Sequence, residues 1–194
     1  MPTWSRRPTV ALAALAAALT AALAAQAPSA PKVDQAYEEL GHRHAAIDPT
    51  SRGFSREEGV FLSRLFELVD LAIVEKSEAW TWFQSEGRKG SDVREYRQRI
   101  DALILRLDGL PAPDRLRDVQ RLLVAAIREQ RAFFEAWDRA MAGGGGDDPA
   151  RGKHLQDSSA KLHQAYDALL HLFPDAGQQN FDAFYDHLCV LDLL

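Results

Sequence analysis

One stretch of the sequence, Ser55–Phe83, constrains the fold more than any other. Between residues 59 and 74 its few polar residues recur every three or four positions: Ser63, Arg64, Glu67 and Asp70. On a helix this spacing gives one narrow polar stripe and leaves the rest of the surface apolar. Such a helix needs several neighbours to cover it, so we expect it to be the central helix of an all-α, up-and-down four-helix bundle.

Other segments with apolar residues at steps of three and four predict further helices, over 31–46, 91–109, 113–143, 149–173 and from Asn180 onward. Ser55 and Glu58 form a capping box at the start of the central helix, and Asn180 is the expected N-cap of the last one. No segment alternates as a strand would, so we expect no sheet. The short first and last helices are expected to close the ends or flanks of the bundle.

The first 27 residues have the pattern of an export signal. Arg6 and Arg7 precede an uninterrupted run of sixteen mostly small apolar residues, Val10–Ala25, which is shorter than the roughly 20 that a membrane-spanning helix needs. Small residues then allow cleavage after Ala24 or Ala25. We therefore expect residues 1–27 to be removed and the protein to be periplasmic or extracellular. A retained membrane anchor is the alternative, and the sequence leaves the export route open.

After the signal, residues 28–54 read as a short helix and linker, and residues 55–194 as the bundle domain. Removing 1–27 takes away two arginines and no acid, which leaves 21 basic and 28 acidic residues and a net charge of −7. An acidic chain is not attracted to nucleic acid or to anionic lipid, so neither is an expected partner. The single cysteine, Cys189, allows no internal disulfide and is expected to be a buried apolar side chain.

The sequence contains none of the common catalytic motifs. Gly152-Lys153 lacks the preceding glycine and the following hydroxyl residue of a phosphate loop, and there is no Gly-x-Ser-x-Gly nucleophile elbow. The chain is therefore predicted not to be an enzyme.

Two residues are candidates for binding. Trp80 and Phe83 fit the apolar rows of the central helix, whereas Trp82 is expected to be partly exposed, and exposed tryptophan is common at binding hot spots. Gln130 lies on the apolar row of its helix, between Ile127 and Phe134. A buried amide needs a partner, which is either inside the bundle or on a ligand.

Six histidines raise the alternative of a metal site. His163, Asp167 and His171 follow one another at four-residue steps, so on a helix they share one side and offer ligands to a transition metal. Their row adjoins the apolar stripe, so a solvated face explains it equally well. His42 and His44 would point in opposite directions on a helix. Glu39-x-x-His42 resembles half of a di-iron motif, but the chain holds no second copy.

Haem is the other cofactor to consider, because exported bundles sometimes carry it. The Cys-x-x-Cys-His attachment motif is absent, so haem would be held non-covalently, with Met141 and a histidine as axial ligands. The sequence thus predicts an exported, non-catalytic helical bundle that binds a protein partner or a small ligand. A bundle that binds a transition metal or non-covalent haem is the alternative. Neither the partner nor the oligomeric state is indicated.

Overall fold

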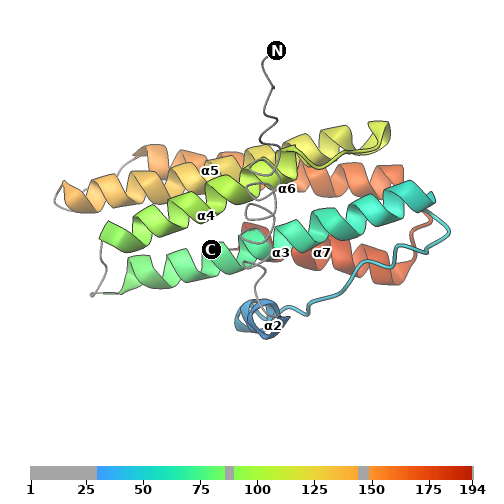
Figure 1. Ribbon diagram of the computed structural model, residues 1–194, viewed down its shortest axis with the longest axis horizontal. Helices are drawn as coiled ribbons and strands as arrows, with labels where there is room; N and C mark the ends of the chain where they lie inside the picture. Colours follow the sequence, from blue (N-terminus) through green and yellow to red (C-terminus); the bar gives the residue numbers. More distant parts are fainter. Residues whose placement is uncertain (1–29, 86–89, 144–148, 194) are drawn as a thin grey trace, which may run out of the picture.

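The computed structural model of the protein describes residues 30–85, 90–143 and 149–193, and these residues are almost entirely helical (Figure 1). The helices are α2 (Ala30–Glu39), α3 (Arg56–Gln84), α4 (Gly90–Asp108), α5 (Arg117–Ala142), α6 (Pro149–Leu172) and α7 (Gln178–Asp192), with a 3-10 turn, η1 (Asp114–Leu116), before α5. No strand occurs in the described ranges, which confirms the all-α prediction. Residues 1–27 lie outside these ranges, so their role as an export signal stays a prediction. No described helix has the length and apolar character needed to cross a bilayer.

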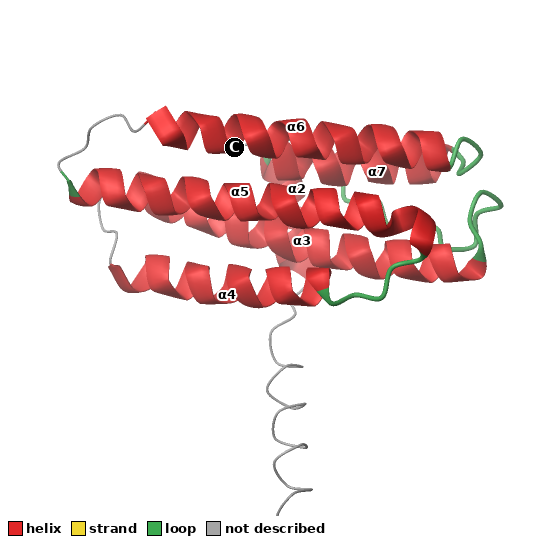
Figure 2. Ribbon diagram, turned by 90° about the horizontal axis from the view of Figure 1, so that it is seen from above, coloured by secondary structure: helices red, strands yellow, loops and turns green. Residues whose placement is uncertain are grey.

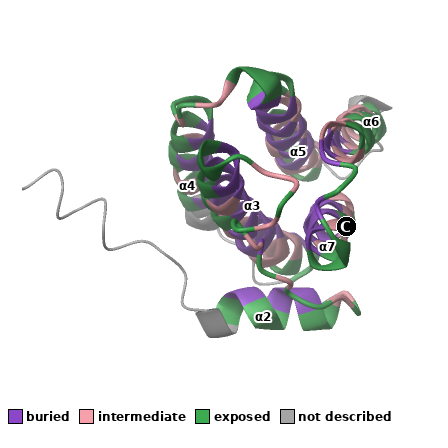
Figure 3. Cartoon of the chain, turned by 90° about the vertical axis from the view of Figure 1, so that its right-hand side faces the viewer, coloured by how far each residue is buried: buried purple, intermediate pink, exposed green. Residues whose placement is uncertain are grey.

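The four long helices, α3 to α6, run up and down side by side, with α7 parallel to their long axis (Figures 1 and 2). Seen end-on, α7 fills the space between α3 and α6, while α2 lies crosswise over the outer side of α3 and α7 (Figure 3). The predicted bundle with short flanking helices at either end of the chain is therefore confirmed.

Helix α3 is the centre of this arrangement, since it packs against α2, α4, α5 and α7. Its core side chains are almost fully enclosed, among them Leu62, Leu65, Phe66, Val69 and Ile73. Val60 is the exception and is 45% exposed. The capping box at its start is present, with the Ser55 side chain accepting from the Glu58 amide and the Glu58 carboxylate accepting from the Ser55 amide.

Some local predictions were wrong. The first helix, expected to reach residue 46, ends at Glu39. Asp70, expected on the solvated stripe of α3, is only 8% exposed because α2 and α7 cover that part of the helix. Asn180 does not cap α7, which starts two residues earlier behind Gly177, whose φ of 81° is easily reached only by glycine. The Asn180 side chain instead donates to the Ala176 carbonyl and accepts from the Asp48 amide.

A buried polar network fixes the end of α7. Lys76 of α3 is 3% exposed, and its Nζ donates to the Leu191 carbonyl oxygen at 2.5 Å. Gln130 of α5 donates to the same oxygen at 2.7 Å. These donors satisfy a helix carbonyl that has no partner within α7. Burial lowers the pKa of Lys76 to about 7, and the nearby carboxylate of Asp192 opposes this effect only in part.

Candidate metal centre

The site begins with the way α2 ends. Gly41 has a φ of 75°, and its amide donates to the Glu38 carbonyl while the His42 amide donates to the Tyr37 carbonyl. These two bonds and the left-handed glycine form a Schellman motif, which stops the helix and turns the chain out of it. The chain then continues through residues 42–48 without regular structure. We call residues 42–48 the strap.

The strap lies along α7 in the opposite direction. At its start, His42 Nδ1 is 3.0 Å from Asp186 Oδ1. Near its end, the Ala46 carbonyl accepts from Gln179 Nε2 at 3.2 Å, and the Asp48 amide donates to the Asn180 side chain. The partners on α7 thus move toward its N-terminus as the strap proceeds. This path carries the middle of the strap over α3 and α7.

Three side chains meet beneath the strap: His44 from the strap, Asp70 from α3 and His187 from α7. His44 Nε2 lies 3.1 Å from Asp70 Oδ2, and His187 Nε2 lies 3.2 Å from Asp70 Oδ1. All three ligand atoms lie within 4.8 Å of one another. In the described part of the chain, no other group of three or more His, Cys, Asp or Glu side chains lies this close together. Two imidazoles and a carboxylate therefore converge on one point.

The outer nitrogen of each imidazole faces a hydrogen-bond acceptor. His187 Nδ1 is 2.7 Å from the Ala183 carbonyl oxygen, and His44 Nδ1 is 3.1 Å from an Asp34 carboxylate oxygen. Neither acceptor has a proton to give, so both Nδ1 atoms carry the hydrogen. In a neutral imidazole the inner Nε2 then presents a lone pair. Both Nε2 atoms lie close to the Asp70 carboxylate, which also has only lone pairs to offer.

Tyr37 orients the carboxylate from α2. Its side chain is fully buried, and its hydroxyl donates to Asp70 Oδ1 at 2.8 Å. Burial is the main cause that raises the pKa of the Tyr37 phenol, and the Asp70 charge raises it further. The phenol therefore keeps its proton and acts as a donor. Its ring packs 5.0 Å from that of His44 and 5.5 Å from that of His187.

The three converging side chains differ in their exposure to solvent. The His187 side chain is 2% exposed and packs edge-on against Phe66, with ring centroids 4.7 Å apart. The side chain of Asp70 is 11% exposed, whereas that of His44 is 28% exposed. The cluster thus has a closed, aromatic inner wall and meets solvent on the side of the strap.

The distances suit a shared metal ion. Two bonds of about 2.1 Å at tetrahedral or octahedral angles place their ligand atoms roughly 3.0–3.4 Å apart. The separations of 3.1 and 3.2 Å between the imidazoles and Asp70 fall in this range. Metal-binding histidines also almost always donate the other ring N–H to a carboxylate or a backbone carbonyl, as both do here.

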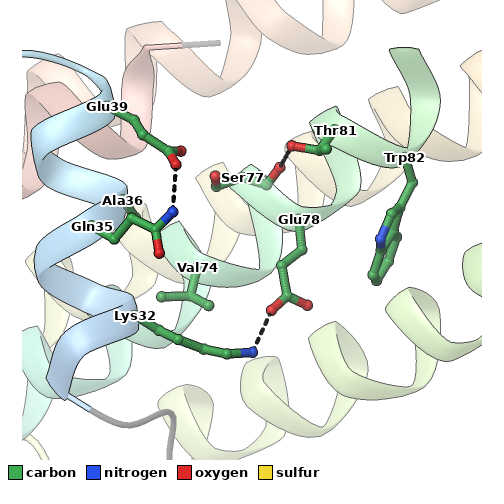
Figure 4. Close-up of a pocket in the computed structure, with 9 residues that line it drawn as sticks. All are labelled: Lys32, Gln35, Ala36, Glu39, Val74, Ser77, Glu78, Thr81 and Trp82. Atoms are coloured by element: carbon green, nitrogen blue, oxygen red, sulfur yellow. Dashed lines mark hydrogen bonds and ion pairs between the residues drawn. The ribbon is translucent and has the colours of Figure 1, made fainter. Parts of the chain in front are cut away.

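Trp82, one of the predicted binding residues, is half-buried. A groove of about 290 Å³ lies between α2 and α3, and Trp82 stands at the end of this groove that is farthest from α2 (Figure 4). In this groove Lys32 and Glu78 form an ion pair at 2.9 Å, which ties α2 to α3. The Arg99 guanidinium carbon lies 5.2 Å from the centre of a Trp82 ring. A role of Trp82 in partner binding stays a prediction.

The other predicted site residues lie away from the cluster. Gln130 is 4% exposed, and its amide nitrogen has an internal partner in the Leu191 carbonyl. His163, Asp167 and His171 are all exposed on α6, and His163 Nε2 lies 3.4 Å from Asp192 Oδ2. Their use by a metal also stays a prediction. Cys189 is half-buried rather than buried.

The sequence did carry signals for the residues of the cluster, although the prediction missed them. Asp70 is the one charged residue in the apolar run 68–74. His187 shares an apolar face with Phe184, Leu188 and Leu191 at steps of three and four. A polar side chain on an apolar face indicates a buried polar neighbour, and these two side chains lie next to each other. His44 was judged on a helix, but it lies on the strap.

The geometry of the site is the evidence for function in this chain. Compared with protein-family models, with curated proteins and with solved structures, the chain matches none of them.

Proposed function

We propose that this is an exported protein that binds one divalent transition-metal ion through His44, Asp70 and His187. The observation that carries the proposal is the convergence of two imidazoles on Asp70: each Nδ1 faces an acceptor, so the lone pair of each Nε2 is left within 3.2 Å of an Asp70 oxygen, where lone pairs repel one another. A cation at the point of convergence turns this repulsion into attraction. Without a metal, each Nε2 needs a proton of its own to bond to Asp70. A protonated His44 would lie between the carboxylates of Asp34 and Asp70, but a protonated His187, which is 2% exposed, would be a cation held at a high desolvation cost.

The donor set defines the class of metal. Imidazole nitrogen suits Zn²⁺, Co²⁺, Ni²⁺, Cu²⁺ and Fe²⁺, whereas Mg²⁺ and Ca²⁺ prefer sites built from oxygen alone. The cluster offers no thiolate, so it does not favour a soft ion such as Cu(I). Three protein ligands leave at least one coordination position for water or another small ligand. The proposal is one of metal binding, and no reaction is assigned to the site.

Titration of the full mature chain, without a histidine tag, tests the proposal. Co²⁺ is the probe, since it occupies zinc-type sites and its visible absorption reports the ligands. We expect one equivalent to bind. The double variant His163→Gln/His171→Gln is the matched control and should bind as the wild type does. A wild type that binds no Co²⁺, Zn²⁺ or Ni²⁺ would contradict the proposal, and loss of binding in the control would move the site to α6.

Tyr37→Phe should weaken metal binding without abolishing it. The change removes the hydroxyl that orients Asp70 and keeps the buried ring. Loss of such an outer-shell hydrogen bond typically lowers metal affinity by about 10–100-fold. Isothermal titration calorimetry with Zn²⁺ measures the change, and the one-to-one stoichiometry should persist. Equal affinities for the two proteins would show that Asp70 needs no support from Tyr37.

A further inference from the structure

We propose that the strap, residues 42–48, is the exchange element of this site, so that metal enters and leaves by outward movement of the strap and not through the bundle. The inference rests on the metal-binding function proposed above and concerns how that site is controlled. It follows from three features: the burial of the ligands, the way the strap is held at its two ends, and the weak contacts that hold its middle.

Exposure of the ligands identifies the side from which metal arrives. His187 and Asp70 stand on packed helices and are almost closed to solvent, whereas the more exposed His44 belongs to the strap. Exit through the bundle would require α7 to separate from α3. That separation would break the buried bonds from Lys76 and Gln130 to the Leu191 carbonyl. Movement of the strap removes one ligand and leaves the helices packed.

Both ends of the strap are fixed. At its start, the Schellman motif around Gly41 holds the chain against the end of α2. At its end, the Pro49 carbonyl lies directly on Gly59 of α3, so closely that a Cβ on Gly59 would be 2.2 Å from the oxygen. Ile47, beside this end, is buried in the core. The His42 amide belongs to that motif, so the part free to move is short, lies between His42 and Ile47, and includes His44.

Apart from His44, few contacts hold the middle of the strap. They are the partly buried pair of His42 and Asp186, the packing of the half-buried Ala45 against the core, and the exposed bond from Gln179 to the Ala46 carbonyl. Polar contacts open to water are individually weak because water competes for both partners. In the metal-bound protein, the bond from the metal to His44 becomes the strongest tie between strap and bundle. Metal binding and strap closure are thus the same event.

Release of Co²⁺ to excess EDTA, followed by stopped-flow absorption, tests the inference. The variants Gln179→Ala and His42→Gln each remove one strap contact and no ligand. We expect each to release metal about two- to tenfold faster than the wild type, and the double variant about four- to hundredfold faster, with unchanged absorption spectra. Gln178→Ala is the matched control, because Gln178 bonds to Asp182 within α7 and does not touch the strap. Its release rate should equal that of the wild type.

Hydrogen exchange supplies an independent readout. Metal binding should strongly slow the hydrogen exchange of the amides in residues 42–48. It should change the exchange of the amides in the middle of α5 only a little. Equal release rates for wild type and double variant, or strap amides that exchange equally with and without metal, would overturn the inference while metal binding stands. A wild type that binds no metal overturns the proposed function and this inference together, so the two failures are distinct.

Discussion

Replacing His187 with glutamine is expected to abolish stoichiometric metal binding. Structural zinc sites are worth about 10–16 kcal/mol over four ligands, so one ligand carries on the order of 4 kcal/mol, or roughly a thousandfold in affinity. Glutamine keeps a polar side chain of similar length but places no imidazole nitrogen near Asp70. Calorimetric titration with Zn²⁺ measures the loss. Thermal unfolding gives a second readout, because a ligand at 100 times its Kd stabilises the folded state by about 2.7 kcal/mol.

A fold defect must be separated from the loss of a ligand, since His187 is 1% exposed and its Nδ1 donates to the Ala183 carbonyl. His44→Gln supplies the separation because His44 lies on the strap at the surface. Both variants should remain helical by circular dichroism and should show no metal-dependent rise in melting temperature. Retention of wild-type affinity by either one would remove that histidine from the site.

The free energy of unfolding should depend on pH through Lys76, and Lys76→Met should remove this dependence. The folded-state pKa of Lys76, about 7, lies below its ordinary value of 10.5 because burial disfavours the charged amine. Between these two pH values the unfolded chain holds more protons than the folded one, so wild-type stability rises with pH. The full cost of burying the charged Lys76 amine destabilises the fold below pH 7, and this cost is gone above pH 10.5. The difference of about 3.5 between the two pKa values corresponds to on the order of 5 kcal/mol.

Urea unfolding of wild type and Lys76→Met at pH 7 and pH 10 measures this effect. The stability of the wild type relative to the variant should increase by several kcal/mol over that interval. Lys32→Met is the matched control, since it removes a lysine whose side chain is 59% exposed in its ion pair with Glu78. If the unfolding free energies of both variants changed with pH in the same way, the burial of Lys76 would not be the cause of the pH dependence.

Asp70 shows where reasoning from periodicity fails. Ser63, Arg64, Glu67 and Asp70 share one side of α3, and the first three are exposed or half-exposed as predicted. The stripe is therefore real, but its last member lies where α2 and α7 cover α3. Periodicity gives the face of a helix on which a residue lies. It does not give the neighbour that covers that face at each turn.

The sequence by itself determined the helices, most of their ends and the central position of α3. Capping at Ser55, the stop at Gly143 and the spacing of apolar residues act within a few turns, so they can be read locally. Only the tertiary structure decided that Tyr37, His44, Asp70 and His187 meet. These residues come from opposite ends of the chain, and their contact depends on the Schellman turn at Gly41 and on the docking of the strap along α7. No local preference encodes that contact, because it is stable only when the whole bundle is formed.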